Sequence, residues 1–208
     1  MTREEFIEIL KEKGYSYEIE GDKIVVTHDW NVDLDSLVTL PPGVVFRNKG
    51  SIWLNSLVTL PLGVEFRNKG DVWLPSLKNL PPCVMFRNKG DIDLRSLETL
   101  PPGVVFENKG NVDLPSLKTL PSGVKFMNKE AVNLGSLETL PLDVEFRNGE
   151  NVYLYKLKTI PPVMKFLNKG EVYLKSLKGR RFKEWKGNIE GVSSKRLLHF
   201  MISKGVFI

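Results

Sequence analysis

The sequence VVFRNKG at residues 44–50 returns as VEFRNKG at 64–70, VMFRNKG at 84–90 and VVFENKG at 104–110. The interval is twenty residues each time, and no residue is inserted between the copies. Self-similarity at a fixed period of this length is the signature of repeat proteins, in which each unit packs only on its neighbours. Written from residue 51, the unit is SIWLNSLVTLPLGVEFRNKG.

Two short stretches of this unit alternate apolar and other residues. The first is Ile52-x-Leu54, and the second is Val64-x-Phe66-x-Asn68. Alternation with a period of two indicates a strand with one face buried, and the unit contains no helical face of adequate length. The unit is therefore predicted to contribute two short strands.

The residues between these stretches predict corners. Leu57 and Leu60 are expected to point inward, Pro61 and Gly63 break the chain, and the Lys-Gly pair at 69–70 turns it back. One unit is then one coil, and stacked coils bury an apolar side that a lone coil leaves in water. The predicted fold is mainly β: a parallel β-solenoid of seven to eight coils.

The period divides the chain into three segments. Residues 31–178 hold seven full repeats and the first part of an eighth, whereas residues 1–30 and 179–208 lack the period. A solenoid needs ends that differ from its middle, so the two outer segments are predicted to be caps.

Local signals suggest the structure of each cap. Thr2 and Glu5 form a capping-box pattern for a helix, and a tight turn at Gly21 separates two strand-like runs, so the N-terminal cap is predicted as αββ. The C-terminal cap is predicted as a helix that begins at Ser193 or the next residue and ends at Gly205.

Stacking turns each position of the unit into a column along the solenoid. Phenylalanine and asparagine each form an unbroken column. The phenylalanines are expected to stack in the core, and the asparagines to bond backbone groups and their own neighbours at a corner. The columns are Phe46, Phe66, Phe86, Phe106, Phe126, Phe146 and Phe166, and Asn48, Asn68, Asn88, Asn108, Asn128, Asn148 and Asn168.

The motif L-x-x-L-P at 57–61, followed by x-G-V-x-F-x-N, resembles the short leucine-rich repeats of bacterial and phage proteins that carry an "LP" signature. The resemblance covers 31–178 and implies a protein-binding role and a bacterial or phage source. Two departures favour a fairly straight, two-sheet solenoid over a curved horseshoe. Asn68 follows Phe66 by two residues rather than three, and Ile52 with Leu54 supplies a second apolar pair.

One outward column combines aromatic and acidic residues. Three interpretations of it stay open: rings that stack along the rod, a protein interface anchored by Trp and Tyr, and a glycosidase-like pair of carboxylates about 5 Å apart. This face is expected to be flat, without an obvious cleft. The candidate partner-binding residues are Trp53, Trp73, Asp93, Asp113, Tyr153 and Tyr173.

A second column gives an alternative working surface, a basic edge that could follow a phosphate backbone or meet an acidic protein. It could equally be a solvated edge that opposes aggregation. Asp71 and Asp91 follow the turn and are expected to neutralise several of its lysines. The edge consists of Arg47, Lys49, Arg67, Lys69, Arg87, Lys89 and Lys109.

Composition narrows the function classes. The net charge is +5, below that of polybasic nucleic-acid arms. Cys83 is the only cysteine, which excludes an intrachain disulfide and a cysteine-based zinc site. No catalytic, metal or cofactor motif is present, and no apolar run reaches membrane-spanning length. We expect a cytoplasmic, non-enzymatic scaffold with a structural role or one in protein recognition or self-association, or, as the alternative, a nucleic-acid-binding or host-interfering protein.

Overall fold

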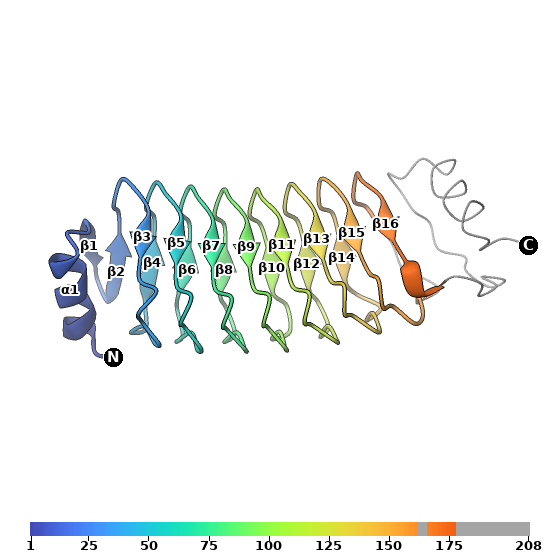
Figure 1. Cartoon of the computed structure of the whole chain (residues 1–208), viewed down its shortest axis with the longest axis horizontal. Helices are drawn as coiled ribbons and strands as arrows, with labels where there is room; N and C mark the ends of the chain where they lie inside the picture. Colours follow the sequence, from blue (N-terminus) through green and yellow to red (C-terminus); the bar gives the residue numbers. More distant parts are fainter. Residues whose placement is uncertain (162–165, 178–208) are drawn as a thin grey trace, which may run out of the picture.

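A computed structural model describes residues 1–161 and 166–177 of the chain as coils stacked along a nearly straight axis (Figure 1). Each coil contributes one strand to each of two sheets. Sheet A has the strand order β1-β2-β4-β6-β8-β10-β12-β14, and sheet B has the order β16-β15-β13-β11-β9-β7-β5-β3. The predicted mainly β, parallel solenoid is confirmed, as is the two-sheet form.

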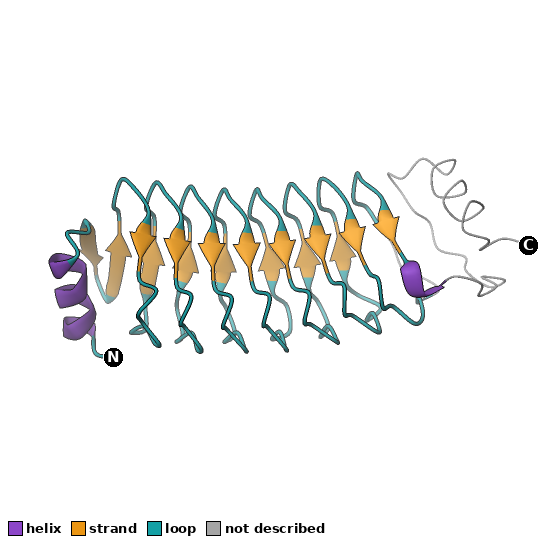
Figure 2. Cartoon of the chain, viewed as in Figure 1, coloured by secondary structure: helices purple, strands orange, loops and turns teal. Residues whose placement is uncertain are grey.

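The strands are very short, because each alternating stretch of the unit supplies only two inward apolar residues before the chain turns (Figure 2). In sheet A the strands of the coils are β4 (Val44–Phe46), β6 (Glu65–Phe66), β8 (Met85–Phe86), β10 (Val105–Phe106), β12 (Lys125–Phe126) and β14 (Glu145–Phe146). In sheet B they are β3 (Val32–Asp33), β5 (Ile52–Trp53), β7 (Val72–Trp73), β9 (Ile92–Asp93), β11 (Val112–Asp113), β13 (Val132–Asn133), β15 (Val152–Tyr153) and β16 (Val172–Tyr173). A short 3-10 helix, η1, spans Lys175–Leu177.

The register between coils follows the repeat. Each strand pairs in parallel with the residues twenty positions away, as Phe66 does with Phe86 and Val72 with Ile92. A single bridge between Phe146 and Phe166 carries sheet A into one further coil. Every position of the unit is therefore a column of equivalent positions along the rod.

The core lies between the two sheets and is built from these columns. The seven phenylalanines of the predicted column are almost fully buried, and their rings stack at centroid distances of 5.1–5.4 Å. The leucines at the corner also point inward, as Leu57 and Leu60 show with 0% and 7% exposure. Stacked rings add about 0.5–1.5 kcal/mol per pair beyond the burial of their area.

The asparagine column closes the opposite corner from inside. Asn68 is fully buried, and its Nδ2 donates to the carbonyl oxygens of Gly70 at 2.9 Å, Asp71 at 3.1 Å and, in the preceding coil, Gly50 at 3.2 Å. The bonds join the amide to backbone only, so the expected bonds between neighbouring asparagines are absent among the described residues. The amide ties its own turn and the coil before it.

The N-terminal segment forms α1 (Arg3–Glu12) and the antiparallel pair β1 (Tyr17–Glu20) and β2 (Lys23–Val26). Thr2 and Glu5 make the reciprocal bonds of a capping box at the start of α1. Strand β2 pairs with β4 and so joins the hairpin to sheet A. At sheet B, the Tyr15 hydroxyl accepts a hydrogen bond from the backbone N–H of Asp33 at 2.9 Å. The helix predicted within 179–208 lies outside the described residues.

Candidate functional site

The candidate partner-binding residues occupy one row on the outer face of sheet B. Paired strands place Trp53 beside Trp73, Trp73 beside Asp93, Asp93 beside Asp113, and Tyr153 beside Tyr173. The sequence prediction that these residues share one face is therefore met. Their exposure differs from the expectation of open rings, because both tryptophans and both tyrosines are half-buried and Asp93 is only 6% exposed.

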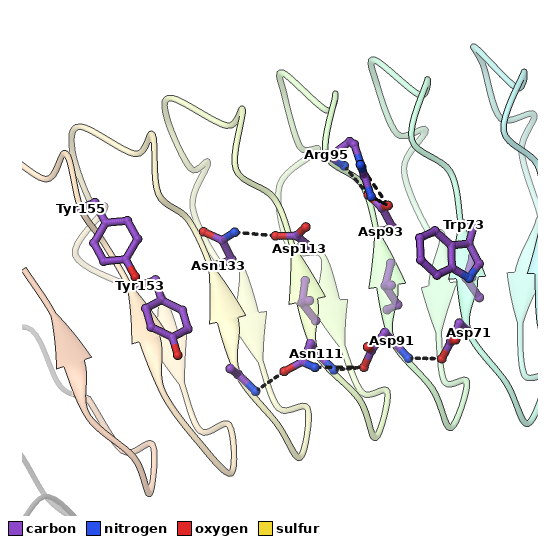
Figure 3. A pocket seen from close by; sticks show the side chains of 14 residues that line it. Asp71, Trp73, Asp91, Asp93, Arg95, Asn111, Asp113, Asn133, Tyr153 and Tyr155 are labelled. Atoms are coloured by element: carbon purple, nitrogen blue, oxygen red, sulfur yellow. Dashed lines mark hydrogen bonds and ion pairs between the residues drawn. The ribbon is translucent and has the colours of Figure 1, made fainter.

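The middle of this row is hollow rather than flat, which corrects the sequence-based expectation. A cavity of about 400 Å³ extends along the face from Trp73 to Tyr153 and Tyr155 (Figure 3). The cause is side-chain size, since the coils between those rings carry the shorter Asp93 and Asp113 at the same position. Large rings at both ends and small polar side chains between them produce a hollow on an otherwise regular surface.

An ion pair between Arg95 and Asp93 lines the hollow. The Arg95 guanidinium holds both carboxylate oxygens of Asp93, with Nε 3.0 Å from Oδ1 and 2.9 Å from Oδ2. The backbone N–H of Arg95 also donates to Oδ1 at 3.0 Å. These bonds satisfy the buried Asp93 carboxylate, and they raise the pKa of Arg95.

Asp113 has a different environment. Its Oδ1 accepts one hydrogen bond, from Nδ2 of Asn133 at 2.5 Å. Burial raises the pKa of Asp113, and the nearby charge of Asp93 raises it further, whereas the bond from Asn133 and the charge of Arg95 act in the opposite direction. A half-buried carboxylate with a raised pKa is a frequent feature of functional sites.

The rings at the far end form a continuous aromatic group. Tyr153 stacks on Tyr173 at 4.9 Å and meets Tyr155 at 5.6 Å with tilted planes. The Lys175 ammonium lies 4.2 Å from the centre of the Tyr155 ring. Among the described residues Trp53 and Trp73 make no ring contact, so the stacking of rings along the rod that the sequence offered as one interpretation does not extend to these two tryptophans.

Sequence reasoning missed Tyr155 and Arg95 as members of this site. Arg95 follows Asp93 by two residues, and Tyr155 follows Tyr153 by two, so both lie just beyond the end of a strand of sheet B. The repeat itself carried the signal, because this position varies among Asp, Asn, Pro, Arg, Gly, Tyr and Lys from one coil to the next. Because the fold does not require one residue type at this position, its variation could have been interpreted as a sign of function.

The lower margin of the hollow is a ladder of short polar side chains. Asp71 Oδ1 accepts the backbone N–H of Asp91 at 2.9 Å, and Asp91 Oδ1 accepts that of Asn111 at 2.7 Å. Asn111 Oδ1 in turn accepts the N–H of Ala131 at 3.0 Å. Asp71 and Asp91 thus connect successive coils, and within the described residues neither makes the ion pair with a lysine of the basic edge that the sequence suggested.

The basic edge is largely neutralised by other acids. Four of its seven cations make ion pairs, and the remaining three, Lys69, Lys89 and Lys109, are exposed without an ion pair in the described part of the chain. The pairs are Arg47 with Glu20, Lys49 with Asp29, Arg67 with Glu65, and Arg87 with Glu107. The edge is thus a mixed-charge surface.

Within 1–161 and 166–177, no group of three or more His, Cys, Asp or Glu side chains is placed to hold a metal ion. No helix in the same ranges has both the length and the apolar character needed to cross a bilayer. Comparisons with protein-family models, curated proteins and solved structures found no match for this chain.

Proposed function

We propose that this protein is a non-enzymatic repeat scaffold that recognises another protein through the outer face of sheet B. One observation supports this choice above all: the outer face of sheet B holds a cavity of about 400 Å³ whose lining has aromatic rings at its ends and carboxylates between them. Trp and Tyr, with Arg, are the residue types enriched among the anchors of protein interfaces. A rod held by continuous sheets loses little conformational entropy when it docks.

The arrangement of the carboxylates favours binding over glycoside hydrolysis. A glycosidase needs two carboxyl groups available to the substrate, one as acid and one as nucleophile or base. Here both oxygens of Asp93 are held by Arg95, which leaves Asp113 as the one carboxyl of this central pair without an ion pair. We therefore assign no catalytic residue to the site.

The proposal extends to the source and location of the protein. The L-x-x-L-P motif supports a relation to the short leucine-rich "LP" repeats of bacterial and phage proteins. Cys83 is a free, exposed thiol, which suits the reducing cytoplasm better than an oxidising compartment. The proposed protein is a cytoplasmic, phage- or bacterium-encoded recognition module.

The test compares two faces of the rod. A partner is recovered from a host lysate with the wild-type protein, identified and purified, and its dissociation constant is then measured for two double variants. Trp73→Ser with Tyr153→Ser removes one large ring from each end of the hollow, and it should weaken binding more than tenfold. Lys69→Ala with Lys89→Ala should alter mainly the association rate and its dependence on salt.

The opposite pattern would reject the proposal. If the aromatic variant binds normally and the lysine variant does not, the basic edge is the working surface. A binding constant that falls steeply with salt, for a recovered nucleic acid, would establish the alternative function. Sedimentation of the wild-type chain over a range of concentrations identifies self-association, which the aromatic variant should also weaken if the hollow mediates it.

A further inference from the structure

The hollow on sheet B carries a charge opposite to that of the whole chain. Its lining includes the four carboxylates of Asp71, Asp91, Asp93 and Asp113 and a single cation, Arg95. The chain as a whole has a net charge of +5. A concave surface of one sign concentrates the field of its charges and attracts ligands of the opposite sign.

Arg95 compensates only part of this negative charge. The guanidinium is committed to the two oxygens of Asp93. Asp113 receives one bond from the neutral Asn133 amide and makes no ion pair within 4 Å in the part of the chain that the structure describes. A cation that entered the hollow would therefore meet a half-buried carboxylate whose charge is not yet paired, where attraction is stronger than in open water.

The rings at the rim suit the same kind of ligand. Aromatic faces attract ammonium and guanidinium groups, and Trp73, Tyr153 and Tyr155 all line the hollow. One ammonium of the chain itself already uses this property, because Lys175 Nζ lies 4.2 Å from the centre of the Tyr155 ring. This contact is independent of the carboxylates and identifies the rim as a place where a cation can rest on a ring.

We propose that the hollow receives a basic side chain, a lysine or arginine, of the partner protein. The cationic head would lie at Asp113, and the aliphatic stem would lie against Trp73 or the two tyrosines, since such stems pack on apolar surface while the head stays polar. The inference rests on the proposed function and adds the chemistry of the residue that the partner must present.

Small probes test this chemistry without the partner. The backbone amide spectrum of the isotope-labelled full chain is titrated with N-acetyl N-methylamide derivatives of lysine, arginine, norleucine and glutamate. Ligands of this size reach dissociation constants of about 1 mM. We expect the lysine and arginine probes to shift amides of β9, β11 and β15, and the norleucine probe, which lacks the charge, to bind at least tenfold more weakly.

A pair of matched variants locates the binding. Asp113→Asn should weaken the lysine probe at least fivefold. Asp33→Asn, at the same place in the unit but outside the hollow, should leave it unchanged. The amide spectrum also shows whether each variant is folded.

Three results would overturn the inference: equal binding of lysine and norleucine, preferential binding of glutamate, or no shift at the hollow up to about fifty times the expected dissociation constant. Its failure is distinguishable from failure of the proposed function. If the probes do not bind but Trp73→Ser with Tyr153→Ser still loses the partner, the face is right and the basic residue is wrong. If the probes bind and the double variant keeps its partner, the hollow takes a cation but is not the recognition surface.

Discussion

The buried asparagine column makes a prediction that depends on hydrogen-bond donors rather than on shape. In the central coil, Asn108 is 1% exposed, and its Nδ2 donates to the carbonyl oxygens of Gly110 at 2.9 Å, Asn111 at 3.1 Å and Gly90 at 3.2 Å. Its Oδ1 has no hydrogen-bond partner among the described residues. The amide therefore acts as a donor, and asparagine and aspartate, which have nearly the same shape, should behave very differently here.

The loss of stability expected for Asn108→Ala depends on which hydrogen-bond donors the three carbonyl oxygens retain. Each retains one other donor: the N–H of Gly110 for Gly90, Nδ2 of Asn128 for Gly110, and the N–H of Ile92 for Asn111. No acceptor is orphaned, so the loss is that of the two N–H groups of the amide. At about 0.5–1.5 kcal/mol per hydrogen bond, the free energy of unfolding should fall by about 1–3 kcal/mol.

Asn108→Asp should be worse than Asn108→Ala at pH 7. It replaces the donor by an oxygen that faces three carbonyl oxygens, and it buries a charge with no partner, which costs several kcal/mol. Protonation relieves both effects, so the pKa of the new carboxyl is raised in the folded state. A raised folded pKa makes stability decrease as pH rises above the ordinary aspartate value of about 3.9, and the variant should thus recover at pH 4.

Urea unfolding followed by circular dichroism at pH 7 and pH 4 measures these differences. The predicted order of stability at pH 7 is wild type, then Asn108→Ala, then Asn108→Asp, and the gap between the two variants should narrow at pH 4. An aspartate variant that equals or exceeds the alanine variant at pH 7 would show that the column does not act as a donor.

Four other predictions follow from single features. Phe106→Ala should lower the free energy of unfolding in urea by about 3–5 kcal/mol through cavity formation, whereas Lys109→Ala should change it by less than about 0.5 kcal/mol; equal effects would refute the assigned facing of β10. Cys83 has φ +65° at a position where Gly43, Gly63, Gly103 and Gly123 have φ between +73° and +76°, so Cys83→Gly should raise the urea midpoint; a lower midpoint would contradict the strain. Burial raises the pKa of Asp113 in the folded protein, so the wild type loses stability as pH rises above the ordinary aspartate value of 3.8, and the melting temperature of Asp113→Asn should rise relative to that of the wild type. A melting-temperature difference that stays constant with pH would refute this. A 1–30 deletion should associate or precipitate in sedimentation assays because it exposes strand edges, and a monomer with unchanged melting would show that this segment is no cap.

The repeat explains why so much of the fold could be predicted from sequence. A period of twenty residues forces the same position of every coil into the same environment, so one reading of Phe66 or Leu57 applied to all its equivalents. Two short alternating stretches per unit were enough to predict two sheets. The register then followed from the absence of insertions.

Features that break the repeat could not be predicted in this way. The hollow depends on the sizes of side chains at one position in five successive coils, and sequence spacing does not convey such a volume. Two charge pairs at the N-terminal end are similar, since Arg47 meets Glu20 and Lys23 meets Glu65 across separations of 27 and 42 residues that do not follow the repeat period. The role of Asp71 as an acceptor for the next coil depends on its orientation, which composition does not specify.

The columns of the repeat differ in how much their residue types vary, and this difference distinguishes structural positions from candidate functional ones. Columns on which the coils depend, such as those of Phe106 and Asn108, hold one residue type at every equivalent position described. The outward column of sheet B instead changes among Trp, Asp, Asn and Tyr while its inward neighbours stay apolar. Since β5 and β11 pair equally well with their neighbours despite opposite outward chemistry, the backbone does not require these side chains. Large half-buried rings that the fold does not need remain partly in water, and covering them contributes about 25 cal/mol per Å². This is the physical reason to look for a partner at the hollow.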